Sequence, residues 1–426
     1  MGFEGFIASA LIVFLTASLI LRSRWPWIPV WSIMMFTSFI AVASGLIAFD
    51  EVGRHIDLNV IFFLIGMFSI VSLANSSGLL DFLAYVVVSK LKSRWSAIIT
   101  SSLLFGLMAA FLVNDSVALL GPPIAFFISK VANVDPEMMC LLLMFSLTVG
   151  SVMTPIGNPQ NMLIAVESGM DAPFIYFIAR LAIPTLLNLI LTPLILIKIY
   201  NVKNVKLDST AMIPQEMIRN RRDALLSGLG LAATVAGIVV NDVFALIGLP
   251  HVTERGFIPL LVASALYIFA SKPRKVLEGV DWGTILFFIG MFITMDAIWS
   301  GGVLQEVLPY IHAFKSEGLI DIYAITVASL TLSQLLSNVP FTKLYITYMR
   351  DLGYSGTDIT SWLTLATSST IAGNLTLLGA ASNIIVLEAL ESKYGRTVSF
   401  VKFLKVGSVV TVANVLTYIP FLALNF

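Results

Sequence analysis

Residues 150–165 read GSVMTPIGNPQNMLIA, a polar interruption inside an apolar run that extends from about 138 to 166. A bilayer-spanning helix needs about 20 apolar residues, and backbone groups freed inside lipid must find partners within the protein. Pro155 and Pro159 remove backbone donors, and Gly157 permits positive φ. The stretch therefore predicts a membrane-spanning helix that is broken at its centre, with the break buried in protein.

The composition places the whole chain in the membrane. Of 426 residues, 58% are hydrophobic and 12% are charged, about half the charged share of a soluble domain. The net charge of zero gives no electrostatic support for binding nucleic acid. Cys140 is the single cysteine, so no intrachain disulfide can form. The first apolar stretch lacks a basic start and a small-residue cleavage site, so we expect a retained helix. The fold class is an all-α polytopic membrane protein.

Two apolar stretches, 97–131 and 320–350, are interrupted by LVNDSVALLGPP (112–123) and LLSNVPFT (335–342). Such polar breaks cannot face lipid, and each stretch has room for two short helices. We expect two re-entrant hairpins with buried tips; the alternative is two full spans in each stretch. The other expected spans are 5–22, 27–48, 58–76, 138–166, 174–199, 222–240, 256–271, 282–300, 360–390 and 402–425.

The longest polar segment, 201–221, is predicted to be a cytoplasmic linker between a first repeat, 1–200, and a second repeat, 222–426. Cytoplasmic loops are enriched in Lys and Arg. With re-entrant hairpins and the linker inside, 19 of the 25 basic residues fall on the inner side. The count favours a multi-pass protein of the cytoplasmic membrane with both termini outside. The inner residues are Arg22, Arg24, Lys90, Lys92, Arg94, Lys130, Lys198, Lys203, Lys206, Arg219, Arg221, Arg222, Lys272, Arg274, Lys275, Lys393, Arg396, Lys402 and Lys405.

The two halves resemble each other at a nearly constant spacing. FFLIGMF at 62–68 matches LFFIGMF at 286–292, and TPIGNPQN from 154 aligns with TLLGAASN from 376. Each half then contains about five spans plus a hairpin, an odd number of crossings, so the repeats are predicted to be inverted. Inverted repeats let one midplane site alternate between faces. Three pairs share one spacing in the sequence: Gly66 with Gly290, Gly78 with Gly302, and Asn114 with Asn338.

Polar residues at membrane depth gather at the two hairpin tips and the two broken helices. Half-helix ends expose carbonyls that suit a cation and N–H groups that suit an anion. The alternative is that these residues only satisfy one another in helix packing. The candidate substrate or ion ligands are Asn114, Asp115, Ser116, Thr154, Gly157, Asn158, Asn161, Ser337, Asn338, Pro340, Lys343, Gly373, Asn374, Thr376 and Asn383. Possible Na⁺ ligands among them are Asn114, Asp115, Asn158, Asn338 and Asn383.

Asp115 is the sharpest single candidate, because an ionisable residue near mid-membrane is costly. It could bind Na⁺, carry a proton, or bond within its own hairpin. Lys343 could attract an anion, pair with Asp115, or extend outwards to the membrane surface. Asp296 is a weaker candidate near the outer end of its span, and Arg180 and Glu388 are expected to lie between helices or at the interface.

Other chemistry finds little support in the sequence. His55, His251 and His312 fall in predicted outer loops without metal-ligand spacing, so no metal site is expected. No GxxxxGK[ST] loop suggests ATP-driven pumping. No nucleophile and base pair suggests an enzyme, and we expect no catalytic residues and no cofactor. A receptor would usually carry a signalling domain larger than a loop of about 20 residues.

GSVMTPIGNPQNMLIA, LLSNVPFT and STIAGNLTLLGAASNIIVLEA (369–389) resemble motifs of the ion-transporter superfamily. That group includes arsenite-efflux permeases, NhaD-type antiporters, citrate and dicarboxylate permeases and the melanosomal P protein. The nearest resemblance is to arsenical-pump-like prokaryotic anion permeases. It implies a homodimer with a scaffold and a mobile transport domain, and a site between opposed hairpins and unwound helices. The tips depart from the Ser-Asn-Thr signature of dicarboxylate carriers, which favours the arsenite or inorganic-anion branch.

Together these features predict a secondary transporter that moves a small anion or arsenite-like oxyacid, coupled to Na⁺ or H⁺. One alternative is a cation/proton antiporter that uses Asp115 as the exchanging carboxylate. The second alternative is a dicarboxylate or citrate carrier. Cys140 sits early in its span, away from the four motifs, and we expect it to be dispensable.

Overall fold

The computed structural model describes residues 2–21, 25, 28–88, 92–207 and 218–424. The described chain is helical, and its only β-type pairing is an isolated bridge between Ser93 and Lys206. This confirms the all-α class. Arg22, Arg24, Lys90 and the linker residues 208–217 lie outside the described part of the chain.

The helices follow the order expected from the sequence. The first half contains α1 (Phe3–Leu21), α2 (Val30–Ala43), α3 (Val52–His55), α4 (Leu58–Ser77), α5 (Leu79–Val88), α6 (Arg94–Leu112), α7 (Asn114–Ala132), α8 (Pro136–Ser151), α9 (Pro159–Glu167) and α10 (Pro173–Ile199). The second half contains α11 (Arg221–Leu246), α12 (Phe257–Phe269), α13 (Pro273–Glu278), α14 (Trp282–Ser300), α15 (Val303–Val307), α16 (Leu319–Leu336), α17 (Asn338–Asp351), α18 (Ile359–Ile371), α19 (Ala381–Tyr394) and α20 (Phe400–Ala423). Short 3₁₀ turns lie at 49–51, 308–310, 372–374 and 377–379.

Each expected span coincides with a helix or with a helix pair separated by a break. Eight described helices are long and apolar enough to cross a bilayer. The two expected hairpins are the pairs α6–α7 and α16–α17, whose helices pack against each other within each pair. The expectation of short hairpin helices is wrong for three of the four, because α6 and α7 have 19 residues each and α16 has 18. Their re-entrant character and the inverted repeat stay predictions.

Both hairpin tips turn on a single non-glycine residue with positive φ. Val113 has φ 65° and joins α6 to α7, and Ser337 has φ 70° and joins α16 to α17. Such backbone is uncommon for non-glycine residues and unusual for a β-branched one. Each tip is followed at once by an asparagine, Asn114 or Asn338, that begins the next helix. Because these asparagines are partners in the predicted repeat, Val113 and Ser337 occupy equivalent positions in it.

The two broken helices are α8–α9 and α18–α19. The first break contains residues 152–158, and the second contains residues 372–380. Asn158 caps α9 by accepting a hydrogen bond from the Asn161 backbone N–H at 2.8 Å, and Pro159 follows it in the first turn. A proline is tolerated there because that N–H has no partner within the helix. The residues that follow the break therefore favour the start of a new helix, α9.

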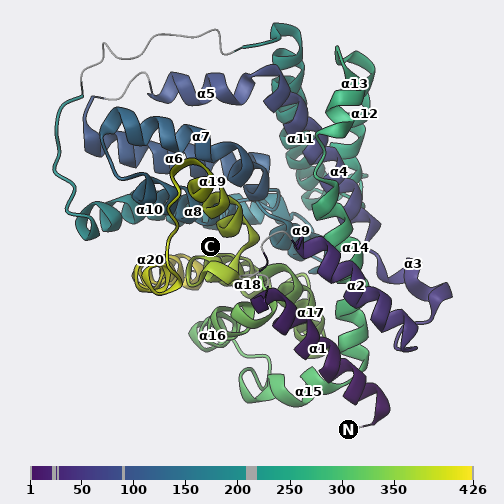
Figure 1. Ribbon diagram of the computed structural model, residues 1–426. Coiled ribbons are helices and arrows are strands. Elements are labelled where there is room, and N and C mark those ends of the chain that lie inside the picture. The colour runs from purple at the N-terminus through teal and green to yellow at the C-terminus, as the bar shows by residue number, and fades with distance from the viewer. Residues whose placement is uncertain (1, 22–24, 26–27, 89–91, 208–217, 425–426) are drawn as a thin grey trace.

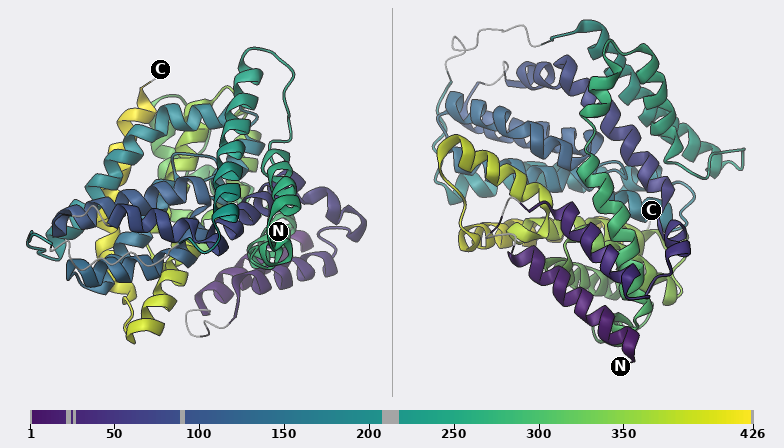
Figure 2. Two further views of the ribbon diagram at one scale, coloured as in Figure 1. Left: turned by 90° about the horizontal axis from the view of Figure 1, so that it is seen from above. Right: turned by 45° about the vertical axis from the view of Figure 1, so that its right-hand side comes forward.

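The helices form two packing units, which are visible in Figure 1 and from two further directions in Figure 2. The unit that we call the frame consists of α1–α4 and α11–α14, where α2 packs on α14 and α4 on α12. The carrier unit consists of α6–α10 and α16–α20, where α6 and α7 pack on α8 and α16 packs on α18. The units meet where α17 contacts α14, α9 contacts α4 and α10 contacts α11.

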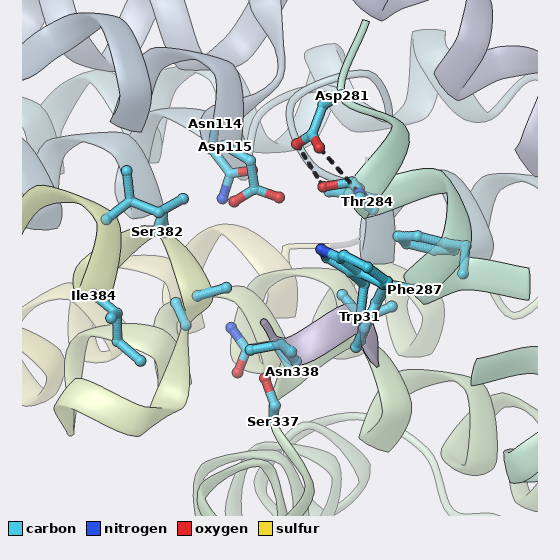
Figure 3. Close-up of a pocket in the computed structure, with 18 of the residues that line it drawn as sticks. Trp31, Asn114, Asp115, Asp281, Thr284, Phe287, Ser337, Asn338, Ser382 and Ile384 are labelled. Atoms are coloured by element: carbon cyan, nitrogen blue, oxygen red, sulfur yellow. Dashed lines mark hydrogen bonds between the residues drawn. The ribbon is translucent and has the colours of Figure 1, made fainter. Parts of the chain in front are cut away.

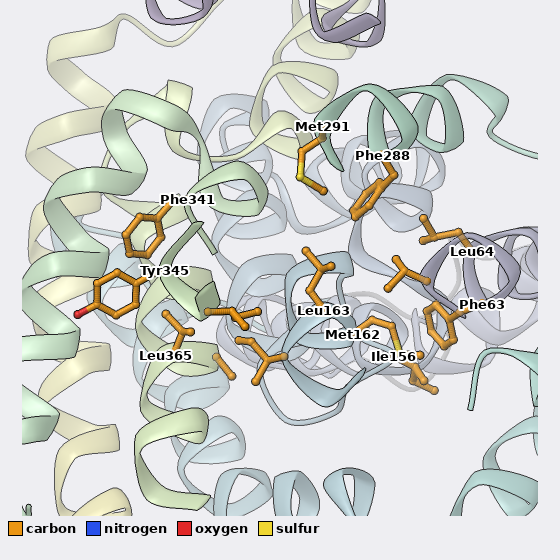
Figure 4. Close-up of a cluster of buried hydrophobic side chains, with 14 of the residues drawn as sticks. Phe63, Leu64, Ile156, Met162, Leu163, Phe288, Met291, Phe341, Tyr345 and Leu365 are labelled. Carbon is orange, nitrogen blue, oxygen red and sulfur yellow. The ribbon is translucent and has the colours of Figure 1, made fainter. Parts of the chain in front are cut away.

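The seam between the units is largely apolar. Figure 4 shows Phe63, Leu64, Phe288 and Met291 of the frame close to side chains of the carrier unit, including Leu163. Apolar surfaces that meet without many directional bonds can slide at low cost, because dispersion and hydrophobic contacts are not directional.

Candidate functional site

The hairpin tips and the restarts of both broken helices line one cavity of about 570 Å³, shown in Figure 3. This volume lies within the usual range for small-molecule sites. Of the sequence candidates, Asn114, Asp115, Ser337 and Asn338 line it. The frame contributes the N-terminal ends of α2 and α14. The other polar or aromatic lining residues are Thr16, Trp31, Gln160, Asp281, Trp282, Thr284, Phe287, Phe288, Gln334 and Ser382.

Four carrier helices, α7, α9, α17 and α19, begin at this cavity. Among the described residues, no side chain caps the first turn of α7, α17 or α19. The first four N–H groups of a helix lack intrahelical acceptors, and the helix dipole makes this end positive. The convergence of such helix starts creates a region suited to an anion.

The charged side chains of the cavity are both acidic. Asp115 comes from the first tip, and Asp281 caps α14, where it accepts from the Thr284 backbone N–H at 3.0 Å and from the Thr284 hydroxyl at 2.6 Å (Figure 3). Among the described lining residues there is no Lys, Arg or His. The side chains therefore suit a cation, while the helix ends suit an anion.

Several buried oxygens at the cavity find no hydrogen-bond donor within the described protein. They are the side-chain amide oxygens of Asn114 and Asn338 and the hydroxyl of Ser382. A buried polar atom without a partner costs about 1–3 kcal/mol. Since all three residues line the cavity, a bound cation or a donor group of a substrate would relieve that cost.

The first break is held by hydrogen bonds that join the end of α8, the break itself and the start of α9. The Asn158 amide donates to Ser151 Oγ at 3.0 Å and to Thr370 Oγ1 at 3.2 Å. The Asn161 amide donates to the carbonyls of Ser151 at 3.0 Å and Thr154 at 3.1 Å. Asn158 and Asn161 are fully buried and do not line the cavity. These hydrogen bonds indicate that Asn158 and Asn161 stabilise the break and do not contact a ligand in the cavity.

The first break also anchors the first tip. Thr154 Oγ1 donates to the Ala110 carbonyl at 2.5 Å, and the Gly157 carbonyl accepts from the Asn114 backbone N–H at 2.8 Å. A Cβ at Gly157 would lie 2.3 Å from the Ser151 carbonyl oxygen, so only glycine fits there. Thr154 and Gly157 therefore position Asn114 rather than line the cavity.

The threonine of the second break bonds to a side chain, whereas Thr154 of the first break bonds to a backbone carbonyl. Thr376 Oγ1 donates to Gln334 Oε1 at 2.6 Å, and Gln334 Nε2 donates to the Ala372 carbonyl at 3.0 Å. Asn383 donates to the Gly373 carbonyl at 2.8 Å. The amide oxygens of Asn374 and Asn383 are buried and have no hydrogen-bond donor in the described part of the chain, like those of Asn114 and Asn338. Of these residues, Gln334 lines the cavity, whereas Thr376, Asn374 and Asn383 hold the break without lining it.

The remaining candidates lie away from the cavity. Ser116 and Pro340 belong to the first turns of α7 and α17 and do not line it. Lys343 binds both carboxylate oxygens of Glu167, at 2.9 and 3.1 Å. The hypothesis that Lys343 pairs with Asp115 is therefore wrong, because five residues of helix carry Lys343 about 7–8 Å past the tip.

The other residues singled out in the sequence have defined surroundings. Asp296 Oδ2 lies 2.9 Å from His55 Nδ1, and Arg180 donates to Thr360 Oγ1 at 2.7 Å. Cys140 is buried in α8, Glu388 is exposed on α19 and His251 is exposed in a loop. The described residues contain no group of three or more His, Cys, Asp or Glu that could hold a metal.

His312 lies in a loop, as expected, but is buried. Its Nδ1 lies 2.7 Å from the Tyr345 hydroxyl, and its Nε2 lies 3.1 Å from that of Tyr354. The Tyr354 hydroxyl donates to Asp321. Burial, followed by the hydrogen bond to Asp321, raises the pKa of Tyr354, so the hydroxyl keeps its proton. This network joins the loop of His312, which precedes α16, to Tyr354 in the loop between α17 and α18.

Sequence reasoning missed several lining residues, above all Asp281, Gln160 and Ser382. A signal for Asp281 exists in the repeat, since it follows Asp57 at the spacing that separates Asn114 from Asn338, and each aspartate caps the next helix. Gln160 and Ser382 are equivalent in the alignment of the two breaks.

The family model for citrate transporters, CitMHS, matches residues 11–367. The chain belongs to this family. It is therefore a multi-pass membrane transporter and not an enzyme, in agreement with the superfamily resemblance in the sequence. The description of the family names citrate as the substrate, whereas the sequence motifs favour the arsenite or inorganic-anion branch.

Relatives and solved structures agree with this assignment. An uncharacterized transporter of Mycobacterium tuberculosis is 26% identical over 401 residues, which cover 91% of this chain and 92% of the relative. The P protein of Mus musculus is 23% identical, with 86% of this chain and 54% of the relative covered. The Alcanivorax borkumensis YdaH transporter superposes with a TM-score of 0.59 at 14% identity, covering 88% of this chain and 87% of that chain. MtrF of Neisseria gonorrhoeae gives 0.56 at 10% identity, covering 99% and 95%. These two structures show the shared fold.

Proposed function

We propose that this chain is a secondary transporter that carries a small carboxylate anion of the citrate class together with a coupling cation, Na⁺ or H⁺. The observation that supports it is the composition of one cavity, in which helix N-termini face the same space as two carboxylates and unpaired amide oxygens. The family description supports the anion, and the acidic side chains support the cation.

The anion would bind at the starts of α7, α17 and α19. A free carboxylate can accept hydrogen bonds from first-turn N–H groups, which is how proteins hold anions without basic side chains. The cavity of about 570 Å³ has room for a tricarboxylate and for cations beside it.

The cation would bind near Asp115, with the Asn114 and Asn338 amide oxygens as neutral ligands. Two carboxylates facing one space repel an incoming anion unless a cation or a proton compensates them. The anion then enters only with its cation, which is the thermodynamic requirement for coupled transport. Asp281, on the frame, is the residue whose distance from Asp115 changes if the units move.

Alternating access would follow from the division into frame and carrier unit. The tips and breaks belong to the carrier unit, while Trp31 and Asp281 belong to the frame. The apolar seam between the units would let the carrier unit move the site from one face to the other.

A cation/proton antiporter is the second candidate, because both charged side chains of the cavity are acidic. In that case Asp115 would exchange a proton for the cation. The third candidate is a carrier of an arsenite-like oxyacid that works by the first mechanism, since a neutral oxyacid needs no basic residue to bind it.

Ligand-dependent thermal stability of the purified protein tests these possibilities. We would compare citrate, succinate, phosphate, sulfate and arsenite at several pH values, with Na⁺, Li⁺ or Mg²⁺ against a choline control. A ligand at 100 times its Kd stabilises the native state by about 2.7 kcal/mol. Stabilisation by citrate that depends on a cation or on pH supports the proposal. Stabilisation by cations alone supports the antiporter, and a response to arsenite alone supports the oxyacid carrier.

A further inference from the structure

A network of charged side chains joins the two units away from the cavity. Lys343 of α17 and Glu167 of α9 pair within the carrier unit at 2.9 Å. Lys343 Nζ also lies 4.0 Å from Asp296 Oδ1 of α14, which belongs to the frame. Asp296 in turn lies 2.9 Å from His55 Nδ1. The Asp296–Lys343 contact is thus a polar crossing between the frame and the carrier unit.

The network is mostly shielded from solvent. The side chains of Glu167 and Lys343 are 7% and 12% exposed, and those of Asp296 and His55 are 27% and 26% exposed. The Lys343 ammonium also lies 5.4 Å from the centre of the Phe292 ring of α14. Charge pairs in such surroundings are screened less by salt than exposed pairs are.

This network lies at the opposite end of the site from the frame wall of the cavity. Helix α14 begins beside Asp281, which lines the cavity, and Asp296 comes fifteen residues later, about 22 Å along the axis. On the carrier side, Glu167 lies seven residues past Gln160, about 10 Å beyond the restart of α9. The charged network therefore lies beyond the cavity along both helices, near the ends of α9 and α14.

The same end contains a second polar crossing. Asp242 of α11 accepts from the Phe174 backbone N–H of α10 at 2.7 Å, and Arg255 binds Asp242 at 3.3 Å. Arg255 also donates to the carbonyl of Asp171. Frame and carrier unit are thus held together by polar contacts at the end where α9 finishes and α10 begins.

We propose that the Lys343–Asp296 contact is a latch that keeps the site closed at this end and must break when the site opens there. The proposal rests on the proposed alternating access. Lys343 keeps Glu167 as a partner when it leaves Asp296, so the carrier unit moves with its buried Glu167 still paired. Asp296 keeps His55 as a hydrogen-bond partner within the frame. The latch can open without leaving a buried charge alone, which makes it reversible.

Cysteine labelling tests the latch without a substrate. Leu163 is fully buried on α9 between Gln160 and Glu167, and it becomes the reporter as Leu163→Cys in a Cys140→Ser background. A membrane-impermeant maleimide is added to each side of oriented vesicles in turn. Asp296→Asn removes the crossing but keeps the Lys343–Glu167 pair. We expect it to raise the labelling rate from the latch side about fivefold or more.

Asp358→Asn is the matched control, because it removes one partner of an ion pair, Lys315–Asp358 at 2.7 Å, that includes none of the four network residues; the labelling rate of this variant stays unchanged. Lys343→Met is a second latch variant and raises the rate as Asp296→Asn does. The proposal is overturned if neither latch variant accelerates labelling, or if Asp358→Asn accelerates it equally. The labelling experiment needs no anion, so its result does not depend on the substrate. A wrong substrate assignment would instead appear in the thermal-stability assay.

Discussion

The contact between α6 and α8 predicts the effect of one added methyl group. A Cβ at Gly150 of α8 would lie 2.1 Å from the Gly106 carbonyl oxygen and 2.2 Å from the Gly106 Cα of α6. Ordinary van der Waals contact begins at 3.4 Å, so Gly150→Ala must push the two helices apart. Both neighbours are backbone atoms and cannot rotate away. Overpacking of this kind costs about 1–3 kcal/mol.

The separation would also reach the site, because α6 ends at the first tip and α8 ends at the first break. A shift of about 1 Å at a site of fixed geometry can cost about a hundredfold in function. We expect Gly150→Ala to lower the Tm of the purified protein and to weaken anion-dependent stabilisation at least tenfold. Thermal unfolding with and without citrate measures both effects.

Gly228→Ala is the control for this prediction. Its Cβ would lie 3.7 Å from a Leu79 methyl, an ordinary contact, within α11. Alanine is about 1 kcal/mol better than glycine inside a helix, so this variant should be as stable as the parent or more stable. If Gly150→Ala matches Gly228→Ala in Tm and in citrate response, the close contact of α6 and α8 does not constrain the site.

Three further predictions concern single residues. Asp115→Asn should abolish cation-dependent uptake in proteoliposomes while leaving the Tm within a few degrees; normal rates and ion dependence would contradict a coupling role. Ser337→Gly should raise the unfolding free energy by about 1 kcal/mol, because φ 70° with ψ 160° is a region that glycine occupies almost alone; a lower Tm would contradict this account of the tip. Cys140→Ser should retain uptake, since the thiol is buried in α8; loss of uptake would place a thiol in the transport path.

The sequence predicted the positions of tips and breaks because lipid leaves little choice. A run such as Asn114-Asp115-Ser116 inside an apolar stretch must turn inward. Both tips fall within the predicted interruptions, directly before Asn114 and Asn338. A site between the two hairpins is what the family resemblance implies, and residues of both tips line one cavity.

The sequence could not reveal which residues satisfy one another. Asn158 and Asn161 look like ligands in a motif, yet their amide groups donate to Ser151 at the end of α8. Glu167 ends an apolar helix without any local sign that Lys343, far along the chain, would bind it. Asp281 reads as an ordinary helix cap, and its place at the cavity depends on how α14 packs in the folded protein.

Val113 and Ser337 hold nearly the same unusual φ with unrelated side chains. Neither is glycine, so the surrounding contacts, such as that between Asn114 and Gly157, impose the geometry. A tip whose backbone is already held by such contacts has less conformational entropy to lose when a ligand binds there. In the proposed alternating access, the rate of the transport cycle would then depend on the movement of whole helix units and not on the ordering of a loop around the substrate.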